Sequence, residues 1–212
     1  MDDQAQAEAY ASADFAEPHD HFVKMYGEFH PGSEPKTVLD LGCGPGDISC
    51  RFARAYPDCQ LVGVDGAQSM LDAGTPIIEK AGVQDRVRLM HGYLPGAQLP
   101  DLEFDTVISN SLLHHLEDPM VIWESIKKYG HPGAGVFVMD LMRPANTDTA
   151  AAIVKAHSGD EPEVLKEDFY NSLLAAYRVD EVKAQLEASG LSQLQVKAVS
   201  DRHFIVYGHL AN

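Results

Sequence analysis

The sequence predicts an α/β fold built on a doubly wound, mostly parallel sheet, and three observations lead to it. Short apolar runs that suit strands buried on both faces alternate with segments that suit helices. A glycine-rich turn, LGCGPG, joins the first of these strands to the helix that follows it. An aspartate, Asp65, stands directly after the second apolar run, LVGV, at the expected carboxyl end of that strand.

The stretch 37–65, TVLDLGCGPGDISCRFARAYPDCQLVGVD, predicts a strand, a glycine loop, a helix and a second strand in succession. Gly42, Gly44 and Gly46 lack side chains, so they permit a tight turn with positive φ and let a ligand approach the backbone. Asp47 is expected to cap the next helix, because its carboxylate can accept from amide groups that the first turn leaves unpaired. Asp65, about 20 residues beyond the glycine turn, is placed to accept hydrogen bonds from a ribose.

The spacing of the glycines distinguishes between nucleotide ligands. A dinucleotide fingerprint requires G-x-G-x-x-G, with a third glycine close to a pyrophosphate. Asp47 occupies that third place here and would repel a pyrophosphate, so a nicotinamide or flavin ligand is disfavoured. The pattern D-x-G-x-G-x-G, which begins at Asp40, suits a ligand that carries a cationic centre and an amino-acid ammonium group.

This stretch resembles the first motif of the class I methyltransferases that use S-adenosylmethionine. The resemblance implies that the loop 40–46 holds the amino-acid end of the cofactor, that Asp65 holds the ribose, and that Met70 and Tyr93 flank the adenine. Tyr93 departs from the family, which often has an aspartate there. The resemblance and the order of the strands together give this set of cofactor-binding residues: Asp40, Gly42, Cys43, Gly44, Gly46, Asp65, Gly66, Met70, Gly92, Tyr93, Leu94, Asn110 and Ser111.

A second resemblance to small-molecule methyltransferases of this class lies in NSLLHHLEDP, residues 110–119. Ligands of parallel sheets bind outside the carboxyl ends of the strands, which places Asn110 and Ser111 beside the methionine part of the cofactor. His114 and His115 follow at the rim, and histidine titrates near neutral pH, as a general base requires. Adjacent helical residues point about 100° apart, so one of the two is expected to face the ligand. The alternative is that either histidine packs or caps locally.

Residues 1–35 are expected to form a helical lid, with one helix over 5–15 and a second that ends before Pro31 and Gly32. In many members of the class such a segment closes over the cofactor, and Tyr10, His19 and His21 would then face the substrate. Tyr10 is also a candidate catalytic residue behind the histidine pair. Alternatively, His19 and His21 belong to a solvated or capping cluster of side chains. A metal site is the less favoured alternative, and we therefore expect no metal.

The resemblance covers residues 36–142, the expected cofactor-binding core, and extends to the final strands. Residues 143–178 are expected to form an inserted helical cap over the substrate. Arg143 would bind an anionic substrate there or, alternatively, form a salt bridge that shapes the loop, and Tyr170 would line the chamber. Residues 179–212 should supply the last helix and the two strands that close a Rossmann-like, seven-stranded sheet with one antiparallel strand. The whole chain, 1–212, is thus expected to form one domain.

Composition limits the partners of the chain. The 212 residues carry a formal net charge of −16, which opposes the phosphate backbone of a nucleic acid. No apolar run reaches the ~18 residues of a membrane span, and the acidic N-terminus is unlike a secretory signal. Three cysteines without zinc-ligand spacing suit a reducing cytoplasm. We therefore expect a cytoplasmic monomer or homodimer that has no nucleic-acid or membrane partner.

These observations predict an S-adenosylmethionine-dependent methyltransferase that acts on a small molecule, with the acceptor atom, O, N, S or C, left open. The main alternative is a non-catalytic protein that binds the same cofactor as a sensor or scaffold. A nicotinamide oxidoreductase and a methyltransferase of macromolecules are further alternatives, which Asp47 and the acidic charge respectively disfavour.

Overall fold

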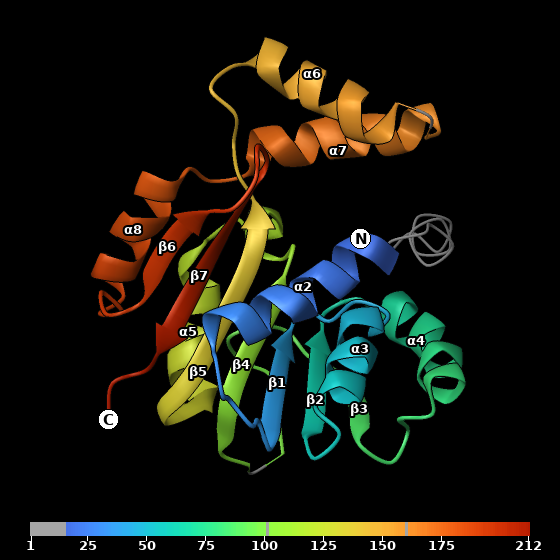
Figure 1. Ribbon diagram of the computed structural model, residues 1–212, viewed down its shortest axis with the longest axis vertical. Helices are drawn as coiled ribbons and strands as arrows, with labels where there is room; N and C mark the ends of the chain where they lie inside the picture. Colours follow the sequence, from blue (N-terminus) through green and yellow to red (C-terminus); the bar gives the residue numbers. More distant parts are fainter. Residues whose placement is uncertain (1–15, 101, 160) are drawn as a thin grey trace.

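The computed structural model describes residues 16–100, 102–159 and 161–212. It contains one sheet of seven strands in the order β3-β2-β1-β4-β5-β7-β6, which confirms the predicted architecture (Figure 1). β7 runs antiparallel to both of its neighbours, β5 and β6, and the other pairs are parallel. The strands are β1 Thr37–Leu41, β2 Gln60–Asp65, β3 Val87–His91, β4 Phe104–Asn110, β5 Gly130–Leu141, β6 Gln195–Ala198 and β7 His203–His209.

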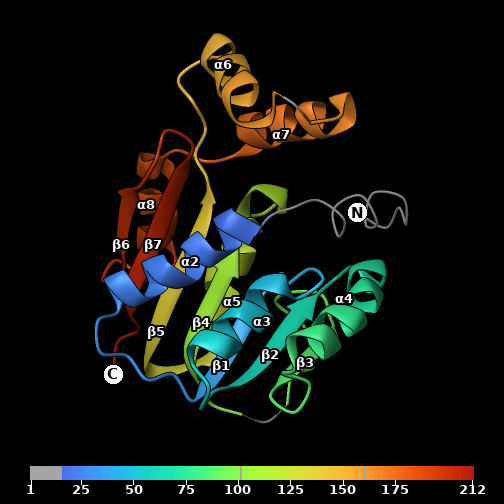
Figure 2. The same ribbon diagram turned by 45° about the vertical axis from the view of Figure 1, so that its right-hand side comes forward.

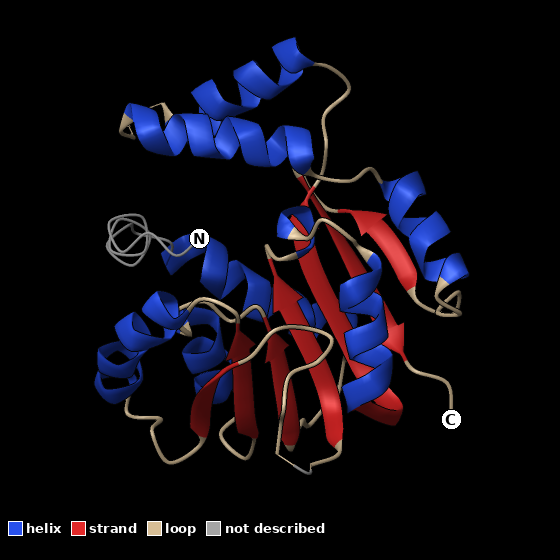
Figure 3. Ribbon diagram, turned by 180° about the vertical axis from the view of Figure 1, so that it is seen from behind, coloured by secondary structure: helices blue, strands red, loops and turns tan. Residues whose placement is uncertain are grey.

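Helices cover both faces of the sheet, because successive residues of each buried strand point to opposite sides. In β1, Val38 packs with α2 (Ala16–Phe29), α3 (Asp47–Ala55) and α4 (Gln68–Ala81). Its neighbour Leu39 packs on the other face with α5 (Met120–Tyr129) and α8 (Val179–Ala188), the side that Figure 3 presents.

A helical hairpin stands beyond the carboxyl edge of the sheet (Figure 2). It consists of α6 (Thr147–Ser158) and α7 (Glu163–Ala175), which share a small apolar core with Leu141 at the end of β5. Residues 143–178 therefore form the helical segment that the sequence predicts at this place, and α7 contacts the short 3₁₀ helix η1 (Leu113–His115).

Two elements extend beyond what their local sequence patterns indicate. β5 begins at Gly130, ahead of the apolar run VFVMDLM that starts at Val136, because its first residues pair irregularly with the start of β4. α4 runs unbroken through Pro76. A Cβ on Gly74 would lie 2.7 Å from the carbonyl oxygen of Pro45, so this glycine lets α4 pack directly on the glycine loop. The expected helix over residues 5–15 lies outside the described residues, as does Tyr10.

No helix among the described residues is both long and apolar enough to cross a membrane. The three cysteines are free and buried.

Candidate active site

The glycine loop adopts a conformation that only glycine accepts readily. Gly42, Gly44 and Gly46 have φ angles of +69°, +53° and +79°, in the left-handed region. A Cβ on Gly42 would lie 2.7 Å from Cδ1 of Leu112, whereas a Cβ on Gly44 would meet nothing within 4 Å. Gly42 is thus needed for packing, and Gly44 leaves open space beside the backbone where a ligand could lie.

Asp65 organises the same loop from the end of β2. Its carboxylate accepts hydrogen bonds from the amides of Gly44 and Ala67, both at 2.8 Å. The side chain is only partly buried, so its oxygens retain acceptor capacity toward a ligand. The carboxylate therefore joins the loop to the start of α4 at the position where a ribose is expected.

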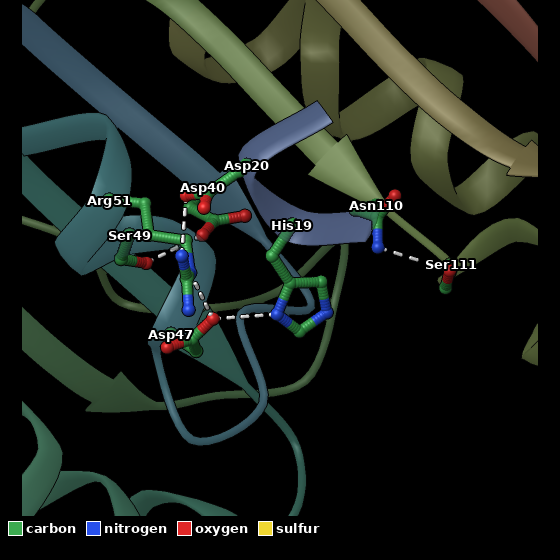
Figure 4. A network of polar contacts seen from close by, with 8 residues as sticks. All are labelled: His19, Asp20, Asp40, Asp47, Ser49, Arg51, Asn110 and Ser111. Atoms are coloured by element: carbon green, nitrogen blue, oxygen red, sulfur yellow. Dashed lines mark hydrogen bonds and ion pairs between the residues drawn. The ribbon is translucent and has the colours of Figure 1, made fainter. Parts of the chain in front are cut away.

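Asp40 lies beneath the loop rather than in the open space. It is 2% exposed and accepts a 2.6 Å hydrogen bond from the hydroxyl of Ser49 in α3 (Figure 4). Burial raises the pKa of Asp40 to about 7, against the lowering effect of the Ser49 hydrogen bond and with a smaller raising effect from Asp65. Asp40 thus supports the loop from the protein interior.

Asp47 does not cap α3, which corrects the expectation. Gly46 occupies the N-cap position and Asp47 is the first helical residue, without a side-chain cap. Its carboxylate instead accepts from Nδ1 of His19 and Nε of Arg51, each at 2.6 Å, and Arg51 also binds Asp20 (Figure 4). We call His19, Asp20, Asp47 and Arg51 the lid clasp.

The lid clasp fastens α2 to the first turn of α3, directly after the glycine loop. Burial alone would raise the pKa of Asp47, but the hydrogen bonds from His19 and Arg51 hold that pKa below its ordinary value. His19, expected at the substrate, is thus engaged with Asp47 and buried. His21 is exposed on the same helix, close enough to His203 to contribute to lowering its pKa.

The expected adenine position is bounded by Met70, Gly66 and Tyr93. Met70 is buried, whereas Tyr93 is 67% exposed and its ring lies 3.1 Å from where a Cβ on Gly66 would be. A Cβ on Gly92 would lie 2.8 Å from Cβ of Ala97, so that glycine allows close packing. Leu94 packs at the edge of the core, and the Tyr93 ring lies above the backbone of Gly66.

β4 ends in a turn with an unusual backbone. Ser111 has φ +56°, the one positive φ of a non-glycine residue among the described residues. The hydroxyl of Ser111 accepts a 3.1 Å hydrogen bond from the side-chain amide of Asn110. The backbone N–H of Ser111 donates to the carbonyl oxygen of Met139 in β5. Such strain persists where surrounding structure imposes it, often at functional sites. The turn leads into η1, which carries the two histidines.

His114 forms a buried pair with Asp140, a residue that the sequence analysis missed. Nδ1 of His114 lies 2.6 Å from Oδ1 of Asp140, and the two side chains are 5% and 1% exposed. Asp140 also accepts from the amides of Leu113 and Leu141, both at 2.7 Å. The available signal was an acid inside the apolar run VFVMDLM, because a buried carboxylate requires partners.

His115 lies beside this pair, with its ring centroid 4.0 Å from that of His114. It keeps an exposed edge, yet loss of hydration around the rest of the ring, and then the neighbouring His114, lower its pKa to about 4. His114 and His115 therefore differ in role: Asp140 holds the first, and the second remains neutral beside it.

Two expected substrate residues are engaged elsewhere. Arg143 binds Glu181 and donates to the carbonyl oxygen of Ala176, which matches the alternative of a salt bridge that shapes the loop. Tyr170 packs partly buried against the small core of the hairpin. Among the described residues, no group of three or more His, Cys, Asp or Glu side chains is arranged to hold a metal ion.

The fold and this site define a class of protein. Residues 33–190 match a family model described as a methyltransferase domain, so the chain belongs to that family. Together with the seven-stranded sheet and the glycine loop, the match makes it a member of the class I S-adenosylmethionine-dependent methyltransferases.

Similar proteins agree with this family. An uncharacterized methyltransferase of Mycobacterium tuberculosis is 31% identical over 113 residues, 52% of this chain and 53% of that protein. The 27-O-demethylrifamycin SV methyltransferase of Amycolatopsis mediterranei is 27% identical over 166 residues, 77% of this chain and 56% of that protein. The chain thus spans about half the length of these curated relatives.

Solved structures share the fold. A SAM-dependent methyltransferase from Aquifex aeolicus superposes with a TM-score of 0.71 at 20% identity, and the match covers 99% of both chains. A plantazolicin methyltransferase solved in complex with SAH gives a TM-score of 0.67 at 13% identity, over 90% of this chain and 82% of that one.

Proposed function

We propose that this chain transfers the methyl group of S-adenosylmethionine to a small-molecule acceptor. The observation that carries the proposal is the open space beside Gly44, next to the partly exposed carboxylate of Asp65. Three left-handed glycines, an acid at the next strand end and a strained turn at the end of β4 fit this cofactor at the carboxyl edge of the sheet.

Different residues of the site would bind different parts of the cofactor. The backbone of the glycine loop would hold the amino-acid end, Asp65 the ribose, and Met70 and Tyr93 the adenine. Asn110 and Ser111 would line the methionine part. The bound cofactor supplies an electrophilic methyl group on a sulfonium centre, so the protein mainly aligns the acceptor and excludes water.

Charge and architecture support a small acceptor over a macromolecule. The net charge of −16 opposes a nucleic-acid substrate, and the hairpin of α6 and α7 stands over the carboxyl edge of the sheet. A relative named 27-O-demethylrifamycin SV methyltransferase supports the same substrate class. His114 or His115 would act as acid or base.

Four expectations stay predictions from the sequence. They are a cytoplasmic location, a single domain over 1–212, a monomer or homodimer, and a role for Tyr10.

Calorimetric titration with S-adenosylmethionine and S-adenosylhomocysteine tests the proposal. We expect both to bind, and we expect Asp65→Ala to weaken binding by about 1–3 kcal/mol, the range of hydrogen bonds to a charged group. Asp58→Ala is the matched control, because Asp58 is exposed and pairs with Lys36 near the opposite edge. Binding of NADH but of neither methionine derivative would contradict the proposal.

A second candidate is a non-catalytic protein that binds the same cofactor. Tyr93, where the family often has an acid, favours it. Formation of S-adenosylhomocysteine in the presence of any acceptor would exclude it, and this is measured by mass spectrometry on the protein used for calorimetry.

A further inference from the structure

We propose that Asp40 distinguishes S-adenosylmethionine from S-adenosylhomocysteine by their charge: it holds a proton beneath the glycine loop when no cofactor is bound, and releases that proton to solvent when the positively charged cofactor binds. The inference rests on the proposed function and goes beyond it in two ways. It assigns a specificity-determining role to a buried residue, and it makes cofactor affinity depend on pH differently from product affinity.

Asp40 is a buried carboxyl group that receives little compensation for its burial. It is 2% exposed. Within the described part of the chain it accepts one hydrogen bond, from the neutral hydroxyl of Ser49 at 2.6 Å, and it takes part in no ion pair. A buried carboxylate with neither a cation nor several donors takes up a proton more readily than one in water. Asp40 is therefore suited to hold a proton near neutral pH.

A second buried acid of the same sheet has far more support. Asp140 is 1% exposed, but it accepts hydrogen bonds from the amides of Leu113 and Leu141, and Nδ1 of His114 lies 2.6 Å from its Oδ1. Hydrogen bonds to the charged form of a carboxyl group favour that form. The two acids are equally buried, so the difference in donors makes the charge of Asp40 the more sensitive to an added ligand.

Asp40 lies within electrostatic reach of the space where the cofactor is proposed to bind. Burial raises its pKa to about 7, the Ser49 hydrogen bond lowers that pKa, and the charge of Asp65 raises it further. The carboxylate of Asp65 in turn accepts a 2.8 Å hydrogen bond from the amide of Gly44, beside the open space of the loop. A positive charge in that space would therefore act on Asp40 without touching it.

The other groups around Asp40 leave this response to Asp40 itself. Its partners in the sheet are Gly63 of β2 and Ile108 of β4, which carry no charge. Burial raises the pKa of Cys43 in the loop well above its ordinary value and that of Cys50 in α3 to about 11, so both stay neutral thiols. The charged side chains of the lid clasp, on the same side of β1, pair with one another (Figure 4).

The two ligands differ in the charge that would act on Asp40. Both carry an ammonium and a carboxylate group, but S-adenosylmethionine also carries a sulfonium charge that its product lacks. An opposite charge nearby lowers the pKa of a carboxyl group by about 1–3. When S-adenosylmethionine binds, the O–H bond of the Asp40 carboxyl group therefore breaks, the proton leaves for water, and the carboxylate attracts the sulfonium. After methyl transfer Asp40 takes a proton back from water and holds the product less tightly.

The first test counts protons by calorimetry. Titration of the full chain at about pH 6.5, in two buffers of different ionisation enthalpy, gives the number of protons released on binding. If the pKa of Asp40 falls from about 7 to about 6, S-adenosylmethionine should release about half a proton from it, and S-adenosylhomocysteine clearly less. Asp40→Asn should remove this contribution. Asp58→Asn, at an exposed site, is the matched control and should behave as wild type.

The second test follows affinity across pH. Between about pH 5.5 and 8, the affinity for S-adenosylmethionine relative to S-adenosylhomocysteine should rise by up to about tenfold in wild type, the effect of lowering one pKa by one. The same ligands with Asp40→Asn account for the titration of their own amino groups. Ser49→Ala removes the donor that lowers the pKa of Asp40, so the rise should move to higher pH. A purely structural role for Asp40 would not shift this profile.

A third measurement observes the proton in the wild-type chain. Infrared difference spectra at about pH 6 should lose the band of a protonated carboxyl group when S-adenosylmethionine is added. The pH at which this band disappears in the ligand-free chain should be higher in Ser49→Ala, which assigns the band to Asp40 without replacing the acid.

The outcomes separate this inference from the proposed function. Equal proton release with the two ligands, a relative affinity that is independent of pH in wild type, or the same pH profile in Asp40→Asn would overturn the role of Asp40 and leave the proposed cofactor standing. Failure of wild type to bind S-adenosylmethionine at any pH would overturn the proposed function.

Discussion

Gly42 and Gly190 have almost the same backbone conformation, with φ +69° and +73°, but different surroundings. A Cβ on Gly190 would meet nothing within 4 Å, whereas one on Gly42 would press on Leu112 at 2.7 Å. The pair therefore separates the strain of a left-handed alanine from the effect of displacing the turn that carries His114.

We expect Gly190→Ala to lower the free energy of unfolding by about 1–2 kcal/mol, the cost of a left-handed L-residue, and to leave cofactor affinity unchanged. Gly42→Ala should incur the same strain and also weaken the cofactor by about tenfold or more, equivalent to about 1.4 kcal/mol. Urea denaturation and calorimetry measure the two quantities. Equal cofactor affinity in the two variants would show that the contact between Gly42 and Leu112 does not shape the site.

The residue scale also shows what a single sequence can convey about a site. The three glycines could be predicted because their conformation is local and few other residues adopt it. The pairing of His19 with Asp47 and of His114 with Asp140 could not be predicted, because it depends on tertiary contacts: His19 lies 28 residues from Asp47, and His114 lies 26 residues from Asp140. Apolar periodicity carries no information about such polar pairs.

At the scale of elements, the lid clasp joins α2 to α3. His19 and Asp47 are largely shielded, with side chains 11% and 31% exposed. The same helix carries an exposed ion pair between Lys24 and Glu28 at 3.9 Å, whose side chains are 73% and 55% exposed. The two pairs differ chiefly in burial and in what they connect, so they form a matched comparison.

A double-mutant cycle of His19→Asn and Asp47→Asn should give a coupling free energy of about 0.5–3 kcal/mol, because the residues share a network. The control cycle of Lys24→Gln and Glu28→Gln should give about 0–1 kcal/mol, the range of exposed pairs. Urea denaturation of each variant measures both. A coupling no larger at His19 and Asp47 than in the control would mean that the lid clasp does not hold α2 in place.

The helices and strands could mostly be predicted from the sequence, but some of their boundaries could not. The strands of the core follow from short apolar runs such as 61–64. The resemblance implied one antiparallel strand, without saying which of the closing strands it is, and the structure shows that it is β7. The early start of β5 was not predictable, because GHPGAG lacks a strand pattern and its first residue, Gly130, is held in the sheet by pairing with Phe104 of β4. α4 tolerates Pro76 because the surrounding packing, with Gly74 against the glycine loop, outweighs local helix propensity.

At the scale of the whole molecule, the fold brings polar groups from distant segments to the carboxyl edge of one sheet. The loop after β1, the acid at the end of β2, the turn after β4 and Asp140 of β5 all lie there, at the edge where open parallel sheets bind their ligands. Burying an ionised carboxylate costs free energy, and this cost varies with pH because the carboxylate can take up a proton. The stability of the molecule should therefore depend on pH through Asp40, which lies fully beneath the glycine loop.

The pKa of Asp40 is raised from 3.8 to about 7, mainly by burial. Between these values the folded state binds a proton that the unfolded state has released, so the contribution of Asp40 to stability falls as pH rises from about 4 to 7 and is constant above that range. The pKa values of His115 and His203 are lowered to about 4, which acts in the opposite sense up to their ordinary 6.5. A wild-type curve alone therefore mixes these effects, and a variant is needed to isolate Asp40.

Asp40→Asn removes the titration while keeping an acceptor for the hydroxyl of Ser49. Relative to wild type, we expect this variant to gain roughly 2–4 kcal/mol in the free energy of unfolding between pH 4 and pH 8, at about 1.4 kcal/mol per pKa unit. Urea denaturation across that range measures the difference, and Asp58→Asn, at an exposed site, should show no such trend. Parallel curves for Asp40→Asn and wild type would mean that the Asp40 carboxylate is ionised in the folded protein despite its burial, with the hydroxyl of Ser49 stabilising its charge.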